Sequence, residues 1–278
     1  MKQRQTNFWN QIRWKNVVIY LLLQVLLYFI FFHQVFSFTN GWFFLVLSML
    51  FFGMFGNLQN NLADYELDSQ KPDFVPFNKT TYLILEIIFL IFGFIFGFTA
   101  FYMTFSPTVL YAILSVPLLL SLYNYFFKKW PLFGNIIIAF LTAFSIYIPI
   151  AYTKGLVFDN PVFYFLIWMA FLISLMRELV KDMEDVVFDK SFNHKTLPVL
   201  SFKVSKLVYA LLILSYFYLL FLYKNDLNNF LFFILFTIGV LSLIFSIKLI
   251  KENRFQNLTQ LFKLWMIIGF LSVIFLSN

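Results

Sequence analysis

The sequence has 278 residues, of which 62% are hydrophobic and only 12% are charged, and its mean hydropathy of +0.83 excludes an ordinary soluble domain. The chain has no cysteine, which excludes disulfides, thiolate nucleophiles and zinc–thiolate sites, and its two histidines, His33 and His194, form no metal-binding motif. The formal net charge is +7, and the basic residues gather in every second connection between the apolar stretches. This distribution is better explained by membrane topology than by nucleic-acid binding.

Long apolar stretches recur along the whole chain. A transmembrane helix needs about 20 apolar residues, and the polar backbone must be satisfied within the segment. We expect about nine such helices, at residues 17–37, 41–60, 80–105, 107–127, 132–152, 160–181, 203–223, 228–249 and 260–277. The predicted fold class is therefore an all-α, polytopic membrane protein with one transmembrane domain over residues 1–278.

The basic residues predict the orientation of these helices. With a cytoplasmic N-terminus, only Lys154 and Lys224 of the 20 Lys and Arg residues fall on the outer side. Nine helices then place Asn278 outside. The long polar segments after the second and sixth helices both become cytoplasmic, and they lie four helices apart. This spacing predicts two similar four-helix halves plus a ninth helix, arranged around a central cavity and embedded in the cell membrane.

The first polar segment, NLQNNLADYELDSQKPDF, continues the second predicted helix. Asn60, Asp64 and Asp68 are four residues apart, so we expect them on one helical face. Carboxylate and amide oxygens are hard ligands that suit magnesium. Without a bound cation these carboxylates would repel one another or would simply be solvated at the helix end. This alternative stays open for this acidic segment, and for the second one described below, when each is considered alone.

A second polar stretch, YNYFFKKWPLFGN, joins the fourth predicted helix to the fifth. Lys128 and Lys129 stand at an inner helix end, where lysines commonly anchor topology. They could also contact a diphosphate, while Tyr123 or Tyr125 faces a developing cation through the negative face of its ring.

The third polar segment, RELVKDMEDVVFDKSFNHKTLPV, begins at the inner end of the sixth predicted helix. Glu178, Asp182, Asp185 and Asp189 are spaced by four, three and four residues, which predicts a second acidic helical face. Arg177, Lys181 and Lys190 partly neutralise it. Mixed charge of this kind suits magnesium bound together with a polyphosphate, and two such segments in equivalent halves point to one shared cavity.

These motifs resemble those of the UbiA-type intramembrane prenyltransferases. The family signature N-D-x-x-D-x-x-x-D appears as Asn60-Asn61-x-x-Asp64-x-x-x-Asp68, and residues 177–198 resemble the geranylgeranylglyceryl phosphate geranylgeranyltransferase branch. Weaker similarities lie in the IRWKN segment at residues 12–16, which resembles R-P-x-N, and in the loop of residues 130–135. Two positions depart from the family pattern: Asn61 replaces an Asp, and Phe74 replaces the Arg of K-P-x-R.

The resemblance implies magnesium-dependent transfer of a prenyl group from a prenyl diphosphate to a lipophilic acceptor, either a lipid or a quinone or other aromatic precursor. It assigns the acidic motifs to residues 60–76 and 177–198. The implied metal ligands are Asn60, Asp64, Asp68, Asp182, Asp185 and Asp189. The implied catalytic residues are Asp64, Asp68, Asp182, Asp185 and Tyr123, and the implied diphosphate-binding residues are Asn16, Lys128, Lys129, Arg177 and Lys181.

Three other functions compete with this hypothesis. In an ion-coupled transporter the acidic residues would carry cations, but inverted repeats and charges at the membrane midplane would then be expected. A CDP-alcohol phosphotransferase would carry a D-G-x-x-A-R run, which is absent. A catalytically inactive family member is consistent with Asn61 and Phe74.

Overall fold

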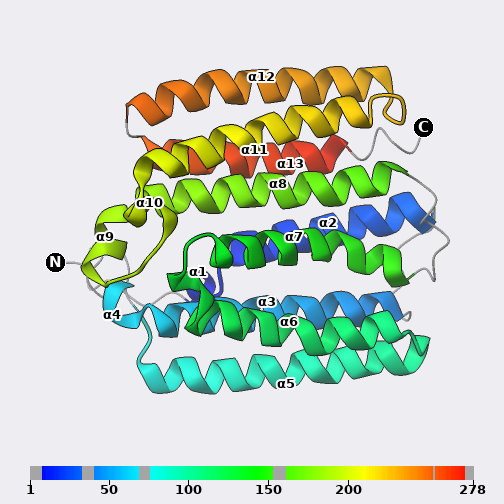
Figure 1. Cartoon of the computed structure of the whole chain (residues 1–278). Helices are drawn as coiled ribbons and strands as arrows, with labels where there is room; N and C mark the ends of the chain where they lie inside the picture. The colour runs from blue at the N-terminus through cyan, green and yellow to red at the C-terminus, as the bar shows by residue number, and fades with distance from the viewer. Residues whose placement is uncertain (1–7, 33–40, 69–75, 153–160, 253, 273–278) are drawn as a thin grey trace. The chain divides into compact units, whose positions relative to one another are not determined.

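The computed structural model describes residues 8–32, 41–68, 76–152, 161–252 and 254–272, and the regular structure in these residues is entirely helical (Figure 1). The chain divides into two compact units. One comprises residues 1–126 with 151–154, and the other comprises 127–150 with 155–278. The boundary at residue 126 agrees with the predicted passage from the first four-helix half to the second. The single domain over 1–278 stays a prediction.

The first unit is built around helix α3, which packs against α2, α5 and α6. Asn78 caps α5 by accepting a hydrogen bond from the Thr81 backbone N–H at 2.7 Å. At the other end of α5, Phe105 adopts a left-handed conformation (φ 50°) and Pro107 starts α6, in agreement with the predicted break between the spans 80–105 and 107–127. The helices are α1 (Phe8–Gln11), α2 (Trp14–Phe32), α3 (Gly41–Ala63), α4 (Tyr65–Asp68), α5 (Lys79–Thr104) and α6 (Pro107–Tyr125).

Helices α3 and α5 approach each other closely because small residues line their contact. The Ser48 hydroxyl donates a hydrogen bond to the Gly93 carbonyl at 2.8 Å. A Cβ atom at Gly93 would overlap the ring of Phe52, which is fully buried. This close approach fixes the long helix that leads to the first acidic motif.

The second unit is built around helix α8, which packs against α11 and α13. Its elements are the 3-10 turn η1 (Phe127–Lys129) and the helices α7 (Phe133–Tyr152), α8 (Pro161–Glu184), α9 (Val186–Ser191), α10 (Leu197–Leu200), α11 (Phe202–Leu222), α12 (Asn229–Lys251) and α13 (Phe255–Ser272). The final residues of α7, from Ala151 on, belong to the first unit.

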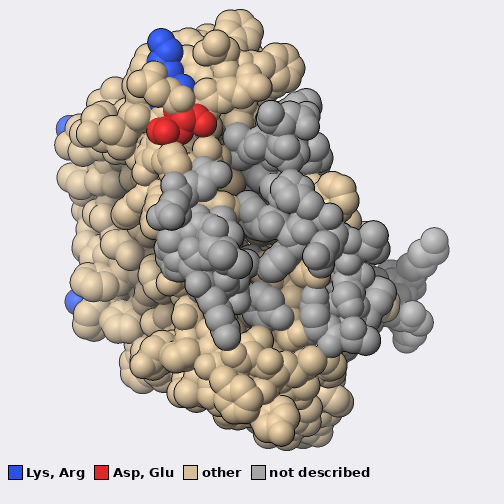
Figure 2. Space-filling view, turned by 90° about the vertical axis from the view of Figure 1, so that its right-hand side faces the viewer, with Lys and Arg blue, Asp and Glu red and all other residues tan. Residues whose placement is uncertain are grey.

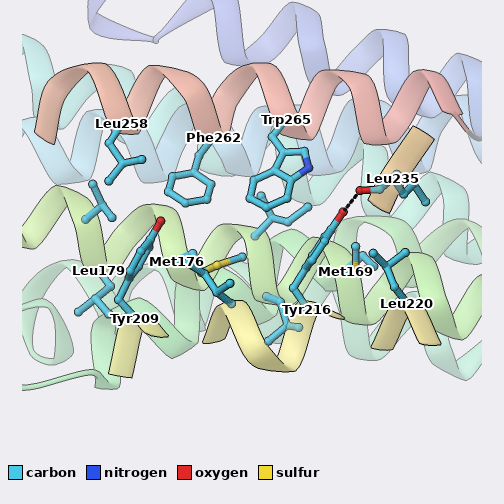
Figure 3. Close-up of a cluster of buried hydrophobic side chains, with 14 of the residues drawn as sticks. Met169, Met176, Leu179, Tyr209, Tyr216, Leu220, Leu235, Leu258, Phe262 and Trp265 are labelled. Carbon is cyan, nitrogen blue, oxygen red and sulfur yellow. Dashed lines mark hydrogen bonds between the residues drawn. The ribbon is translucent and has the colours of Figure 1, made fainter. Parts of the chain in front are cut away.

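Aromatic side chains fill the core of the second unit, and the hydroxyl groups of Tyr209 and Tyr216 form hydrogen bonds within it (Figure 3). Tyr216 on α11 stacks at a tilt on Trp265 of α13, with ring centroids 4.8 Å apart, and its hydroxyl donates to the Leu235 carbonyl at 2.8 Å. The Tyr209 hydroxyl donates to Ser246 at 2.7 Å. These contacts hold α11, α12 and α13 together beside α8, whose inner end carries the second acidic motif.

The helices have the length and the surface of membrane-spanning segments. In the described part of the chain, α3, α5, α6, α8, α11 and α12 are long and apolar enough to cross a membrane, and α2 and α7 contain shorter apolar stretches. Apolar residues one helical turn apart are also more than half exposed, as at Ile84, Ile87 and Ile91 on α5. Figure 2 shows few charged side chains on the face that it views. The chain is thus a multi-pass membrane protein.

The predicted count of nine spans is not confirmed, because α13 does not meet these criteria and α2 and α7 meet them only in part. The first predicted helix begins earlier than expected, at Trp14, and the residues expected to end it, 33–37, lie outside the described residues. The same holds for His33, Lys71, Phe74, Lys154 and Asn278.

Candidate functional site

The first acidic motif lies where α3 gives way to α4. Asn60 is in the last turn of α3 and is only 8% exposed, whereas Asp64 is half-buried in the turn between the two helices. The Asp64 N–H still bonds the Asn60 carbonyl at 3.0 Å. Asp68 ends α4, and its side chain lies outside what the structure describes. The regular helix is therefore interrupted at Asp64, while the predicted common face of Asn60, Asp64 and Asp68 stays a prediction.

Asn61, the departure from the family signature, has a structural role in the first unit. Its side-chain Nδ2 donates to the backbone oxygen of Gln11 at 2.9 Å and to the Gln11 side-chain oxygen at 3.1 Å. The Tyr82 hydroxyl also donates to that side-chain oxygen. Asn61 is 3% exposed, and an aspartate has no N–H to offer these acceptors. The amide thus anchors the α1 segment to α3.

Asn16 and Tyr123, the other predicted site residues of this unit, do not share one environment. Asn16 is exposed in the first turn of α2, and its N–H bonds the carbonyl of Arg13, which has a positive φ of 54°. Tyr123 is half-buried near the end of α6. Their predicted roles stay predictions.

The second acidic motif is interrupted in the same way as the first. Helix α8 ends at Glu184, and Asp185 occupies the cap of α9, so Asp182 and Asp189 lie on different helices. Backbone bonds still run from Asp185 to Lys181 at 3.0 Å and from Asp189 to Asp185 at 2.9 Å. The regular helix is therefore interrupted at Asp185, and the predicted single acidic face stays a prediction.

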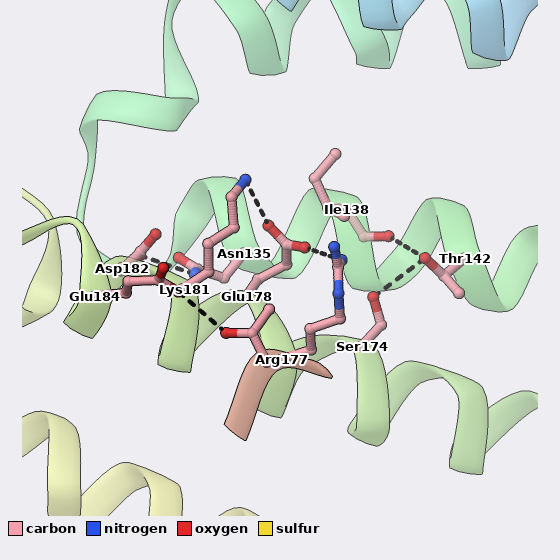
Figure 4. A network of polar contacts seen from close by, with 10 residues as sticks. Asn135, Ile138, Thr142, Ser174, Arg177, Glu178, Lys181, Asp182 and Glu184 are labelled. Atoms are coloured by element: carbon pink, nitrogen blue, oxygen red, sulfur yellow. Dashed lines mark hydrogen bonds and ion pairs between the residues drawn. The ribbon is translucent and has the colours of Figure 1, made fainter. Parts of the chain in front are cut away.

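Glu178 neutralises two cations of this motif (Figure 4). It is 6% exposed and forms a close ion pair with Arg177 and a second one, at 3.8 Å, with Lys181. A buried carboxylate that loses its cations becomes an uncompensated charge, so the three groups stabilise one another. Glu178 therefore holds Arg177 and Lys181 in place. The sequence predicted that these cations partly neutralise the acidic segment, but not that both pair with Glu178.

Asp182 receives a hydrogen bond from a residue that sequence reasoning assigned no role. Asn135, in the first turn of α7, donates from Nδ2 to Asp182 Oδ2 at 2.9 Å (Figure 4). Asp182 is half-buried, and Asn135 is 6% exposed. The only signal in the sequence was the Gly134-Asn135 pair in the loop that resembles the family.

Asp189 is bound by its own loop. Its Oδ2 accepts a hydrogen bond from the Thr196 hydroxyl at 2.9 Å, and its Oδ1 lies 3.3 Å from His194 Nδ1. Asp189 is 9% exposed. These contacts close residues 189–196 on themselves, so this carboxylate stabilises the loop whether or not it also meets a metal.

The Lys128–Lys129 segment is attached to this loop. The Lys195 N–H donates to the Lys129 carbonyl at 3.0 Å, and Lys129 is exposed while Lys128 is half-buried. The second unit therefore brings together seven predicted site residues: Lys128, Lys129, Arg177, Lys181, Asp182, Asp185 and Asp189. Asn16, Asn60, Asp64, Asp68 and Tyr123 belong to the first unit.

The donor set suits a hard cation that the protein ligates only in part. Among the described residues, no three carboxylate or imidazole groups come together as a complete metal site. Mg²⁺ commonly takes one or two carboxylates and completes its shell with water and substrate phosphates. Asp182 and Asp185, with cations one turn away, fit this pattern.

Sequence comparisons identify similar proteins over much of the chain. A model of the UbiA prenyltransferase family matches residues 21–268. The digeranylgeranylglyceryl phosphate synthase of Methanothermobacter thermautotrophicus is 31% identical over 149 residues, which cover 52% of this chain and only 50% of that protein. The synthase of Methanobrevibacter smithii is 27% identical over 248 residues, which cover 82% of this chain and 85% of that protein.

Solved structures with the same fold extend over the whole chain. A structure of digeranylgeranylglyceryl phosphate synthase in membranes aligns with a TM-score of 0.69 at 21% identity and covers 97% of this chain and 96% of that one. A UbiA homologue from Archaeoglobus fulgidus, bound to DMAPP and Mg²⁺, aligns with a TM-score of 0.62 at 16% identity and covers 96% and 99%. At these identities the likeness shows the fold.

Proposed function

Because the chain belongs to the UbiA prenyltransferase family, we propose that it transfers a prenyl group from a prenyl diphosphate to a lipophilic acceptor within the membrane, in a magnesium-dependent reaction. Family membership makes the chain an enzyme of the prenyltransferase class. The proposal also includes the prenyl diphosphate and acceptor substrates and the Mg²⁺ ion. It further places the chain in the cell membrane with nine spans and a cytoplasmic N-terminus.

The observation that carries this proposal is the composition of the α8 end. Asp182 and Asp185 supply carboxylates there, while Arg177 and Lys181 supply cations that Glu178 holds in place. Carboxylates with nearby cations suit a metal–diphosphate pair, because the metal takes the carboxylates and phosphate oxygens take the cations. The same arrangement would be a poor binding surface for a neutral ligand.

Bound Mg²⁺ would neutralise the diphosphate and make it a better leaving group. The proposed metal ligands are Asp64, Asp68, Asp182, Asp185 and Asp189, with Asn60 assisting. Arg177, Lys181, Lys128 and Lys129 bind the oxygens of the diphosphate, and Asn16 helps to close the site. The allylic carbon–oxygen bond breaks and its electron pair leaves with the diphosphate. The acceptor oxygen or carbon then bonds the allylic carbon and gives up a proton, while the Tyr123 ring faces the transient positive charge.

The acceptor is proposed to be a lipid, with an isoprenoid glyceryl phosphate as the first compound to test. The support is the identity of the similar proteins, which are digeranylgeranylglyceryl phosphate synthases. An aromatic or quinone precursor is the alternative acceptor.

The decisive test is transfer by the purified full-length protein. Radiolabelled prenyl diphosphates of several lengths would be supplied with Mg²⁺, a glyceryl phosphate lipid or an aromatic acceptor, and turnover would be compared with and without EDTA. Asp64→Asn and Asp182→Asn should each lower turnover by about 100-fold or more. Asp226→Asn is the matched control, because Asp226 is exposed in the connection between α11 and α12.

Label moving into one acceptor, dependent on Mg²⁺ and on both aspartates, supports the proposal and names the acceptor. Failure of the wild type to bind any prenyl diphosphate refutes it and favours an inactive family member. Equal activity of the two aspartate variants and the control would refute the assigned metal ligands while leaving the reaction in place.

A further inference from the structure

The segment that precedes α7 holds Asn135 in a defined place. Leu132 has a positive φ of 64°, and its carbonyl accepts the Ile136 N–H at 2.9 Å as the helix begins. A few residues earlier, the Lys129 carbonyl accepts a hydrogen bond from the N–H of Lys195, which lies in the second acidic motif. The backbone on the N-terminal side of Asn135 is therefore fixed to the element that carries the acidic residues.

From this position Asn135 makes a contact with defined polarity. A carboxylate only accepts hydrogen bonds, so the amide nitrogen must face Asp182, and the observed Nδ2–Oδ2 distance is 2.9 Å. Asn135 is buried, and rotation of its side chain is restricted by packing. The contact thus fixes the rotation of the Asp182 carboxylate and leaves Oδ1 as the oxygen that Asn135 does not bind.

We propose that Asn135 is a positioning residue of the metal–diphosphate site, which orients the Asp182 carboxylate for metal binding. This inference rests on the proposed function. Hydrogen-bonded partners that orient a metal-binding group raise metal affinity without touching the metal. An aliphatic residue at position 135 would release the carboxylate, and an aspartate would place a second negative charge beside it.

The competing explanation is that the bond merely ties α7 to α8. The structure provides a matched control for it, because Thr142 lies 3.1 Å from the Ser174 hydroxyl (Figure 4). This pair is two turns after Asn135 in α7 and two turns before Asp182 in α8. Thr142→Val removes a polar tie between the same two helices without touching an acidic residue. Asn135→Leu removes the tie at Asp182.

The experiment is a titration of purified full-length protein with Mn²⁺ in the presence of inorganic pyrophosphate, followed by electron paramagnetic resonance of free Mn²⁺. Asn135→Leu should weaken Mn²⁺ binding by about 10- to 100-fold, whereas Thr142→Val should bind as the wild type does. Prenyl transfer by Asn135→Leu should recover at high Mg²⁺. Asn135→Ala is the second variant, in case leucine prevents folding.

Wild-type affinity in the Asn135 variants, or an equal loss in Thr142→Val, would overturn the inference. So would a loss of turnover in Asn135→Leu that no Mg²⁺ concentration restores, because a purely structural role predicts that result. If the wild type binds no Mn²⁺ with pyrophosphate and transfers no prenyl group, the proposed function fails and this inference fails with it. If the wild type binds and transfers but the Asn135 variants match it, only the inference fails.

Discussion

Restoring the family signature at position 61 should damage this protein. In Asn61→Asp a carboxylate would replace the amide that donates to two Gln11 oxygens, at 2.9 and 3.1 Å. Two hydrogen bonds of about 0.5–1.5 kcal/mol each would be lost, and a buried charge would face two acceptors. We expect a loss of about 3 kcal/mol in the free energy of unfolding, which corresponds to a fall in Tm of about 6–12 °C.

The assay is thermal unfolding of wild type and variant in the same detergent, at one scan rate. Asn57→Asp is the control, because Asn57 Nδ2 also donates to a backbone carbonyl next to α1, that of Ile12 at 3.1 Å, but from a half-buried position. The Tm of Asn57→Asp should fall by less than the Tm of Asn61→Asp. Prenyl transfer measured below both transitions should not rise in Asn61→Asp.

A Tm of Asn61→Asp equal to or above that of the wild type would refute this reasoning. So would a gain in transfer activity, since Asn61 would then be a weakened metal ligand and not an anchor for α1.

Two further substitutions test the packing around the motifs. Gly93→Ala should destabilise the first unit by about 1–3 kcal/mol, because the added methyl group overlaps the buried Phe52 ring. The control Gly53→Ala should leave Tm nearly unchanged, because no atom lies within 4 Å of its added Cβ. Equal effects of the two substitutions on Tm would contradict the packing argument. Thr196→Val should remove the hydroxyl that donates to Asp189 and cost about 1–3 kcal/mol locally. Faster amide hydrogen exchange over residues 189–200 would report that loss, and unchanged exchange would argue against a closed loop.

The helices were predictable from the sequence because lipid permits few alternatives. Backbone groups in a bilayer must bond within their own segment, so a long apolar run becomes a helix. The window at 80–105 thus became α5, Lys79–Thr104, and the one at 107–127 became α6, Pro107–Tyr125. Whether each helix spans the membrane is a different question, because α13 also contributes buried aromatic residues such as Trp265 to the core.

The interruptions at Asp64 and Asp185 were not predictable from spacing. A separation of four residues is the same in a straight helix and in one that bends, since the i to i−4 backbone bonds persist across both sites. The spacing of the acidic residues therefore does not show where the regular helix ends.

The role of Asn61 was beyond sequence reasoning for a different reason. Its acceptors belong to Gln11, 50 residues earlier, and Gln11 also binds Tyr82. No local pattern connects these three residues. A substitution that looks like loss of a ligand when set against a family motif is here the gain of a hydrogen-bond donor.

The carboxylates of the second motif differ in what already binds them, and this difference separates their roles. Glu178 is matched by two cations, so a metal ion would have to compete with Arg177 and Lys181 for it. Asp189 accepts from Thr196 within its own loop. Asp182 accepts from the amide of Asn135, and like the Thr196 hydroxyl this neutral donor orients a carboxylate without pairing it with a cation. Glu178 is therefore the carboxylate of this motif least available to a metal ion, because two cations already match its buried charge.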